Sequence, residues 1–377
     1  MTVREALEEI EDVRVDRCKK HKLADILMIC LLGFLCGLKD IENIVYWAKI
    51  REERLKKVMP LENGIPSADT VLRVLSIINP TQFEEVFVKV THGYFKENQS
   101  DEQEFVALDG KTVCGSKKDG HKGIHIISAW ANRLGLCLGQ VKTEQKSNEI
   151  TAIPELLDLL DLKNIVVTID AMGCQKKITE KITEKKSEYV ISLKGNQSTL
   201  HNDVRDYFEA LDDEGFKSRV EIFKTKRVLE KDHGRIETRQ GFLIKDLKWL
   251  KNKDGWSNLN AVGMIKSTRT INGETVTENR YFITSLTDVN KATNALRAHW
   301  GIENKLHWCL DMIFCEDSSR VRKDHSPQNL AIIRKFSLNL LRKVREHSST
   351  MGKMSFTKFQ TRCREEDEFL KEVLTYL

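Results

Sequence analysis

Apolar residues recur at helical spacing along the first quarter of the chain, from about residue 20 to residue 98. Ile41, Ile44, Val45 and Ala48 are an example of one apolar helix face. The segment LMICLLGFLC is apolar throughout but has about half the length that a bilayer span needs, so we expect a buried helix there. The pattern predicts a helical domain over residues 1–100, with the polar segment 96–103 as its linker.

The pattern changes at residue 104 from helical spacing to short β-rich runs. EFVALDG, IHIISAWANR and LGLCLGQVKTE are separated by turn-like segments, which indicates three consecutive antiparallel strands. A helix, a buried strand, a second helix and another strand are expected next, over residues 150–197. This order is typical of a mixed α/β sheet flanked by helices.

Residues after about 200 complete a second domain, which we expect to span residues 101–377. A second β-rich stretch runs from about residue 219 to residue 286, and we interpret residues 200–286 as a β-rich insertion. Helical periodicity returns after Thr287 and continues to the C-terminus.

The composition adds few constraints. The 377 residues are 40% hydrophobic and 31% charged, which is a globular composition. No secretory signal is visible in the acidic first residues, and the nine cysteines form no CxxC pair. We therefore expect a cytoplasmic protein with reduced thiols, without structural zinc and without a membrane partner.

Positive charge is concentrated in two segments, although the net charge is only +5. Residues 217–253 contain twelve Lys or Arg against five Asp or Glu, and residues 320–345 contain eight against one. Such clustering suits a polyanion such as nucleic acid. A solvated surface that keeps the protein soluble would look the same, and the sequence alone leaves both interpretations open.

Two aspartates stand at the ends of predicted strands. Asp109 ends FVALD and precedes Gly110, where a simple turn is also a good explanation. Asp170 ends the apolar run NIVVTID. The carboxyl ends of buried strands are where open α/β sheets bind their ligands.

Glu303 poses a different question. It falls inside an apolar stripe at helical spacing, which would bury its carboxylate unless a core histidine or a metal ion pairs with it. The stripe consists of Leu296, Trp300, Leu306, Leu310 and Ile313. Together with Asp109 and Asp170, Glu303 would suit a pair of Mg²⁺ ions, because hard cations prefer oxygen ligands and paired ions promote phosphoryl transfer.

Several long motifs resemble one known family over nearly the whole chain. They are VALDGKTVCGS, TEQKSNEITAIPELL, VVTIDAMGCQ, YVISLKGNQ, DHGRIETR, RAHWGIENKLHWCLDMIFCEDSSRVR and NLAIIRKFSLNLL. The segment IPSADTVLRVLS and the helices before it are similar to the N-terminal associated domain of the same family. The family is the RHS-associated, H-repeat type of bacterial insertion-sequence transposase.

The resemblance implies a ribonuclease-H-like core with a catalytic DDE triad, here Asp109, Asp170 and Glu303. It implies two Mg²⁺ ions, with Mn²⁺ as a substitute, bound by the same three acids. The implied reaction is strand cleavage at transposon ends in double-stranded DNA, followed by transfer of the freed 3′-hydroxyl into target DNA. A homodimer on DNA is also implied.

One departure from related enzymes concerns the neighbours of the glutamate. Those enzymes often have a Tyr, an Arg four residues before the Glu and a Lys seven residues after it, where this chain has Leu296, His299 and Leu310. Candidate DNA contacts are therefore chosen by position and charge. They are Lys111, Lys194, Asn196, Gln197, Arg235, Arg239, His299, Lys305, Arg320 and Arg322.

Two further expectations complete the sequence interpretation. Trp130, Trp300 and Trp308 are expected in the core rather than as stacking platforms for bases. The alternatives to a transposase are a non-catalytic DNA-binding relative and a metal-dependent nuclease. Cleavage and strand transfer assays would separate the three.

Overall fold

The computed structural model describes residues 2–98, 100, 102–117, 120, 123–143, 148–211, 213–232, 235–347, 352 and 354–374, without the side chains at 18, 216, 231, 232, 235, 347 and 374. The chain divides into two compact units. The first unit contains residues 1–100, 110–148 and 303–377, and the second contains residues 101–109 and 149–302. None of the helices in these described ranges combines the length and the apolar character needed to cross a membrane.

The first unit is mainly helical, as the periodicity predicts. Its N-terminal helices are α1 (Val3–Glu8), α2 (Leu23–Leu35), α3 (Ile41–Ile50), α4 (Glu52–Leu55), α5 (Ala68–Ile77) and α6 (Pro80–Glu97). Every residue of α2 is buried, which confirms the expected core helix. The Ser67 hydroxyl caps α5 and Pro80 occupies the first turn of α6, because both residue types suit helix starts.

The C-terminal part of the first unit contributes its central helix. This part contains α12 (Trp308–Met312), α13 (Ser326–His347), α14 (Phe356–Glu365) and α15 (Asp367–Leu374). Helices α2, α5 and α6 and strand β3 all pack against α13. The strands β2 (His125–Ala131) and β3 (Leu136–Thr143) form an antiparallel hairpin in this unit, as expected.

The second unit is built on a mixed sheet. Strand β1 (Phe105–Thr112) begins here and runs parallel to β4 (Val166–Ile169), which runs parallel to β5 (Glu188–Leu193). The crossover helices are α7 (Glu149–Leu159) and α8 (Lys176–Glu184), and α8 packs on β5. With β2 and β3, all ten strands belong to a mixed sheet, and the predicted mixed α/β fold class, a sheet flanked by helices, is confirmed.

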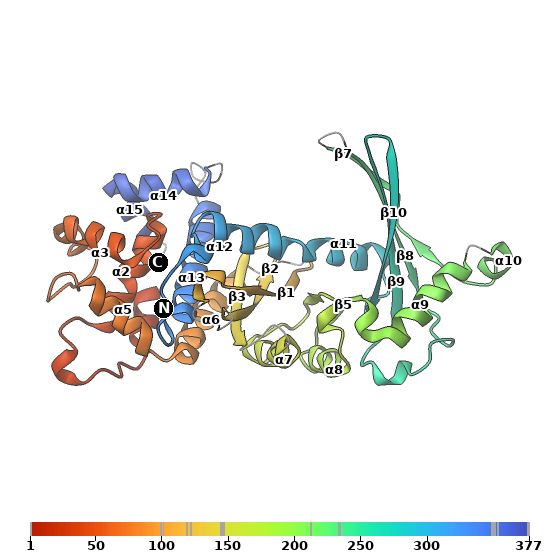
Figure 1. The fold of residues 1–377 in the computed structure, drawn as a ribbon, viewed down its shortest axis with the longest axis horizontal. Coiled ribbons are helices and arrows are strands. Elements are labelled where there is room, and N and C mark those ends of the chain that lie inside the picture. Colours follow the sequence, from red (N-terminus) through yellow and green to blue (C-terminus); the bar gives the residue numbers. More distant parts are fainter. Residues whose placement is uncertain are drawn as a thin grey trace. The chain divides into compact units, whose positions relative to one another are not determined.

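Long antiparallel strands continue this sheet beyond β5. The neighbouring strands are β10 (Glu274–Thr284), β9 (Ala261–Ile271), β8 (Arg235–Ile244) and β6 (Phe223–Lys224), and β7 (Val228–Asp232) also pairs with β8. Helix α11 (Val289–His299) covers one face of the sheet, and α9 (Ser198–Ala210) packs on β10. In Figure 1 the strands β8, β9 and β10 extend well past both helices.

The stretch from residue 200 to residue 286 differs from its β-rich prediction at its start. Helix α9 occupies residues 198–210, followed by the short α10 (Glu214–Lys217). Leu200, Val204 and Phe208 recur at helical spacing and are buried, so the helix forms to place them on the sheet. The division of the chain at about residue 100 stays a prediction.

Candidate active site

Asp109 and Asp170 are neighbours in the second unit. Strands β1 and β4 pair in parallel register up to Leu108 opposite Ile169, so the next residue of each strand is an aspartate. Adjacent strands lie about 4.8 Å apart and paired residues face the same side of the sheet. Both aspartates are half-buried. The two aspartates therefore occupy neighbouring positions where the pairing of β1 with β4 ends, and β1 continues past Asp109 to Thr112.

The turn after Asp170 is fixed by local contacts. The Asp170 carboxylate accepts a hydrogen bond from the Met172 amide at 2.9 Å. A side chain at Gly173 would place its Cβ 2.2 Å from Ile169 Cγ2, so glycine is required there. Asn196 Nδ2 donates to the Ala171 carbonyl at 2.6 Å, and Gln197 Nε2 donates to the Cys174 carbonyl at 2.9 Å. Both amides, expected as DNA contacts, brace this turn.

His299 is buried against β4 rather than presented to DNA. Its side chain is 7% exposed, and its Nδ1 lies 3.0 Å from Thr168 Oγ1. Burial lowers the pKa of His299, although the nearby Asp170 carboxylate opposes the shift. A buried imidazole that is bonded to Thr168 presents little surface to DNA, and its expected DNA contact stays a prediction. The residue instead ties the end of α11 to the strand that carries Asp170.

Glu303 is exposed, which corrects the expectation of a buried carboxylate. The buried face of this segment is formed by Ala295, His299, Ile302, Leu306 and Cys309. Glu303 lies beside this face, and Trp300 is 40% exposed. Of the predicted stripe, Leu306, Leu310 and Ile313 are buried and Leu296 is half-buried against the core, whereas Trp300 is exposed. The glutamate needs no buried partner, and no metal is required to explain its position.

Residues Ile302–His307 form a π-helical segment that contains Glu303. Such segments interrupt the regular backbone ladder and are frequent at functional sites. In the first unit, Arg342 of α13 donates from Nη2 to the Lys305 carbonyl at 3.0 Å. Its guanidinium also lies over the Trp130 ring, 4.8 Å from the centroid. Arg342 therefore supports the turn that follows Glu303.

Lys111 is surrounded by acids of the first unit. Its Nζ lies 2.8 Å from Asp311, 2.9 Å from Asp317 and 3.4 Å from the buried Glu316. Burial alone would lower the pKa of Lys111, but the three carboxylates raise it above its ordinary value. Asp317 also accepts from the Cys114 amide at 2.9 Å. The lysine is engaged within the protein, and its expected phosphate contact stays a prediction.

The remaining predicted DNA contacts differ in their surroundings. Lys194, Lys305 and Arg320 are exposed. Arg322 donates from Nε to the Gly115 carbonyl at 2.8 Å. Arg239 pairs with Glu230 and Glu237. The side chain of Arg235 lies outside the described residues.

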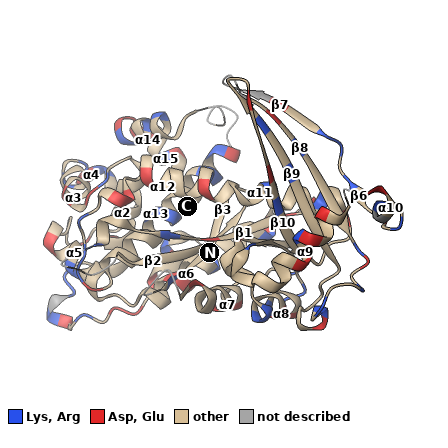
Figure 2. Cartoon of the chain, turned by 45° about the vertical axis from the view of Figure 1, so that its right-hand side comes forward, with Lys and Arg blue, Asp and Glu red and all other residues tan. Residues whose placement is uncertain are grey.

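The two basic segments do not form simple basic surfaces. In the second segment Arg334 and Lys335 are 1% and 2% exposed, because α13 is surrounded by other elements of the first unit. In the first segment Arg239 is paired with two glutamates, and Figure 2 shows both charge signs along β8, β9 and β10.

The prediction for the three tryptophans is right for one and wrong for two. Trp130 is fully buried. Trp300 is 40% exposed and Trp308 is 55% exposed. For Trp300 the failure has the same cause as that for Glu303, because both residues were assigned to the buried face of the same helix. Trp308 was not part of that predicted stripe.

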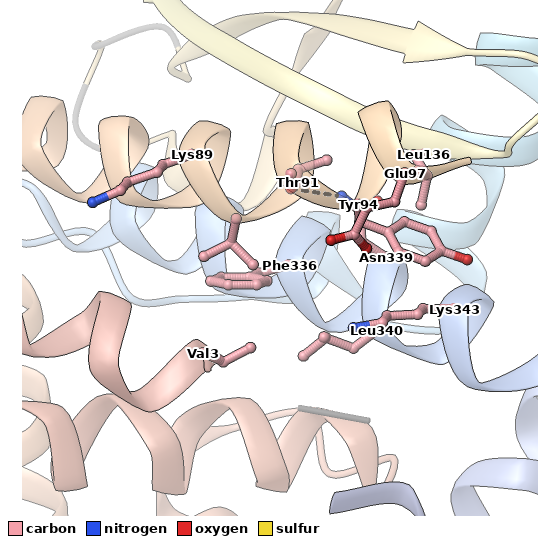
Figure 3. A pocket seen from close by; sticks show the side chains of 12 residues that line it. Val3, Lys89, Thr91, Tyr94, Glu97, Leu136, Phe336, Asn339, Leu340 and Lys343 are labelled. Carbon is pink, nitrogen blue, oxygen red and sulfur yellow. Dashed lines mark hydrogen bonds between the residues drawn. The ribbon is translucent and has the colours of Figure 1, made fainter. Parts of the chain in front are cut away.

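The described side chains do not form a ready-made metal cluster. Among the described side chains, no three His, Cys, Asp or Glu residues are grouped to hold a metal ion. Asp109 and Asp170 belong to the second unit, and Glu303 is the first residue of the last segment of the first. A groove of the first unit, shown in Figure 3, contains none of the predicted site residues. In this groove Asn339 Nδ2 already donates a hydrogen bond to Thr91 Oγ1.

Sequence reasoning missed the supporting residues. Arg342 was counted only as part of a basic segment, and Thr168 was one polar residue in an apolar strand. A buried threonine within NIVVTID is a usable signal, because a hydroxyl inside a central strand requires a partner. The hydrogen bond from Arg342 to the Lys305 carbonyl cannot be predicted from residue spacing.

Comparison with known proteins gives consistent matches. A family model described as "Transposase DDE domain" matches residues 100–340, and one described as "DDE_Tnp_1-associated" matches residues 4–90. "Putative transposase YncI" of Escherichia coli O157:H7 is 39% identical over 345 residues, which cover 89% of this chain and 86% of the relative. "H repeat-associated putative transposase YhhI" of Escherichia coli (strain K12) is 36% identical over 343 residues, covering 88% of each.

The chain also has a distant likeness to a solved structure. The "Cryo-EM structure of piggyBac transposase synaptic complex with hairpin DNA" has 12% sequence identity and a TM-score of 0.44, covering 97% of this chain and 76% of that chain. This likeness is too weak to support any inference about the chain.

Proposed function

The chain belongs to the transposase DDE domain family, and from this premise we propose that it cuts DNA strands at the ends of a mobile element and joins them to target DNA. Asp109, Asp170 and Glu303 are the proposed catalytic acids. The proposed substrates are double-stranded transposon ends and target DNA, and a homodimer would hold two ends together.

The observation that carries this proposal is the pairing of β1 with β4, which makes Asp109 and Asp170 neighbours. The third acid is supported by chain connectivity. His299 is bonded to Thr168, two residues before Asp170, and Glu303 follows His299 by four residues.

The chemistry of the donors fits divalent cations. The three proposed ligands offer only carboxylate oxygens, which Mg²⁺ prefers and Mn²⁺ accepts. When bound, a pair of such ions would activate the attacking oxygen and stabilise the leaving 3′ oxygen. Asp109, Asp170 and Glu303 would hold these ions.

The protein's own side chains have separate tasks in this proposal. The braced turn holds the Asp170 carboxylate in place through Met172, Asn196 and Gln197. His299, whose pKa is lowered by burial, holds the helix end near β4 through its hydrogen bond with Thr168. Exposed lysines such as Lys194 and Lys305 would contact phosphates, which positions DNA without reading its sequence.

The test uses a plasmid that carries the DNA flanking the gene, with strand cleavage and strand transfer measured in Mg²⁺ and in Mn²⁺. Asp109→Asn, Asp170→Asn and Glu303→Gln should each abolish both reactions and leave DNA binding intact. Glu155→Gln, an exposed acid on α7, is the matched control and should remain active.

Each outcome separates the candidate functions. A variant that still cuts removes its acid from the proposed triad. Binding without cleavage by the unaltered protein would favour the non-catalytic DNA-binding alternative. Cleavage without strand transfer would favour a metal-dependent nuclease.

A further inference from the structure

The part of the sheet that extends past α9 and α11 has two faces of different chemistry. It consists of β7, β8, β9 and β10 in the second unit, and Figure 1 shows it projecting beyond the helices. In antiparallel pairs, residues opposite one another share a face. The register therefore assigns each side chain to one face or the other.

One face contains arginines paired with glutamates, and we call it the arginine face. Its described charged residues on these strands are Glu230, Glu237, Arg239, Arg269, Glu274, Glu278 and Arg280. Arg239 is paired with both Glu230 and Glu237, and Arg280 with Glu278. The guanidiniums of Arg239 and Arg280 also lie over the Trp300 ring, at 5.9 and 5.1 Å from the centroid. Its positive charge is largely neutralised.

The opposite face contains hydroxyls and amides, and we call it the threonine face. Its members are Leu229, Ile236, Thr238, Gln240, Lys266, Thr268, Thr270, Thr275, Thr277 and Asn279. The threonines form cross-strand rows, with Thr268 and Thr277 hydroxyls 3.2 Å apart and Thr270 and Thr275 hydroxyls 2.9 Å apart. No described side chain assigned to this face is a carboxylate.

Three cations accompany the threonine face. Lys266 is a member and is exposed. Arg227 reaches it by donating from Nη2 to Thr238 Oγ1 at 3.3 Å. Lys224 is paired with Phe242, which places it on the same face nearer the helices. Among the described residues, no carboxylate forms an ion pair with any of these three cations. Their charge is available to an external anion.

We propose that the threonine face binds the sugar–phosphate backbone of DNA. Threonine, asparagine and glutamine side chains donate hydrogen bonds to phosphate and sugar oxygens, and Lys or Arg neutralises phosphates. The absence of described carboxylates removes the repulsion that the arginine face would impose. The proposal deepens the proposed function, because it names the surface through which this transposase holds its DNA substrate.

The threonine face changes which residues in and beside the first basic segment are expected to contact DNA. Residues 233–239 were expected to supply them through Arg235 and Arg239. Arg239 lies on the arginine face and forms ion pairs with two glutamates, so its positive charge is already neutralised. The expected DNA contacts are instead Lys266, Arg227 and the threonine rows on the opposite face of the same strands.

The test measures binding of a fluorescein-labelled, random-sequence duplex of about 30 base pairs at several salt concentrations, without divalent metal. Lys266→Gln should weaken binding about tenfold at 0.1 M salt and reduce the salt slope by about 0.9, as expected for one lost phosphate contact. Arg269→Gln, three residues along β9 on the arginine face, should change the affinity less than about twofold.

A second pair of variants separates the two faces at neighbouring, exposed positions of β10. Thr277→Glu adds a carboxylate to the threonine face and should weaken binding about fivefold or more, since it repels phosphates. Val276→Glu adds the same charge on the arginine face, opposite Arg269, and should have little effect. Circular dichroism of all four variants verifies that they are folded.

The result that overturns the proposal is equal weakening by Thr277→Glu and Val276→Glu, or an unchanged salt slope in Lys266→Gln. An unaltered protein that binds no duplex also overturns it. The assay contains no metal and scores no cleavage. A face-dependent loss of binding in a protein that never cuts would therefore support this surface and reject the proposed function.

Discussion

His299 Nδ1 lies 3.0 Å from Thr168 Oγ1, although the two residues are 131 positions apart. Thr168 is fully buried within β4, two residues before Asp170. His299 ends α11, four residues before Glu303. One buried hydrogen bond thus connects the strand of the second proposed acid to the helix that leads to the third.

Thr168→Val tests this connection. The substitution keeps the shape of the side chain and removes the hydroxyl, which leaves His299 Nδ1 buried without its partner. We expect a loss of about 1 to 3 kcal/mol in the free energy of unfolding. We also expect slower strand cleavage with unchanged DNA affinity. Urea unfolding and single-turnover cleavage measure the two effects.

The control for that variant is Thr183→Val on α8, whose hydroxyl bonds only to the Thr179 carbonyl of its own helix. It should change cleavage little. Equal cleavage rates for the two threonine variants would show that the bond to His299 has no part in positioning.

Gly173→Ala should disturb the turn that holds Asp170. The new Cβ would lie 2.2 Å from Ile169 Cγ2, and this buried contact has no room to relax. Overpacking of this kind costs about 1 to 3 kcal/mol, so thermal unfolding should detect it. Gly195→Ala is the control, because its Cβ would meet nothing within 4 Å. A Gly173→Ala protein as stable as the control would contradict the argument.

The strands and most helices could be predicted from the sequence because their apolar residues repeat with the period of each element. Asp170 directly follows an apolar strand, as predicted, whereas Asp109 lies inside β1, which continues to Thr112. Their adjacency did not follow, because the pairing of β1 with β4 is a long-range choice that residue spacing does not encode.

Charge patterns were less informative than apolar patterns. Arg334 and Lys335 belong to a basic segment of the sequence but are buried in α13. Arg239 belongs to another but is paired with glutamates. A count of charges along the chain cannot distinguish these cases, because burial and ion pairing depend on which elements meet. The exposure of Glu303 escaped prediction for the same reason.

Arg342→Met should weaken catalysis through the π-helical segment. The change keeps most of the apolar stem over Trp130 and removes the donor to the Lys305 carbonyl. We expect cleavage to fall about tenfold, because hydrogen bonds from charged groups contribute about 1.5 to 3 kcal/mol. DNA affinity should stay within about twofold. Lys343→Met, the next residue of α13, is the control, and an equal fall in both variants would remove Arg342 from this role.

Glu84 should make the stability of the protein depend on pH. It lies on α6, is 5% exposed, and accepts a hydrogen bond from the Gln140 amide at 2.8 Å. Burial raises the pKa of Glu84 to about 8, although the Gln140 amide and Lys335 oppose the shift. Between its ordinary pKa of 4.5 and about 8, the folded protein keeps a proton that the unfolded chain releases.

Because the folded state binds the extra proton, this group favours folding fully below about pH 4.5, and its contribution is lost as the pH rises towards 8. Glu84→Gln removes that dependence. The stability of the variant relative to the unaltered protein should therefore rise between pH 5 and pH 8, by on the order of 2 to 5 kcal/mol. Urea unfolding at several pH values measures it. Glu85→Gln, an exposed neighbour, should show no such trend. A difference for Glu84→Gln that stays constant with pH would mean that Glu84 is ionised in the folded protein, paired with Lys335.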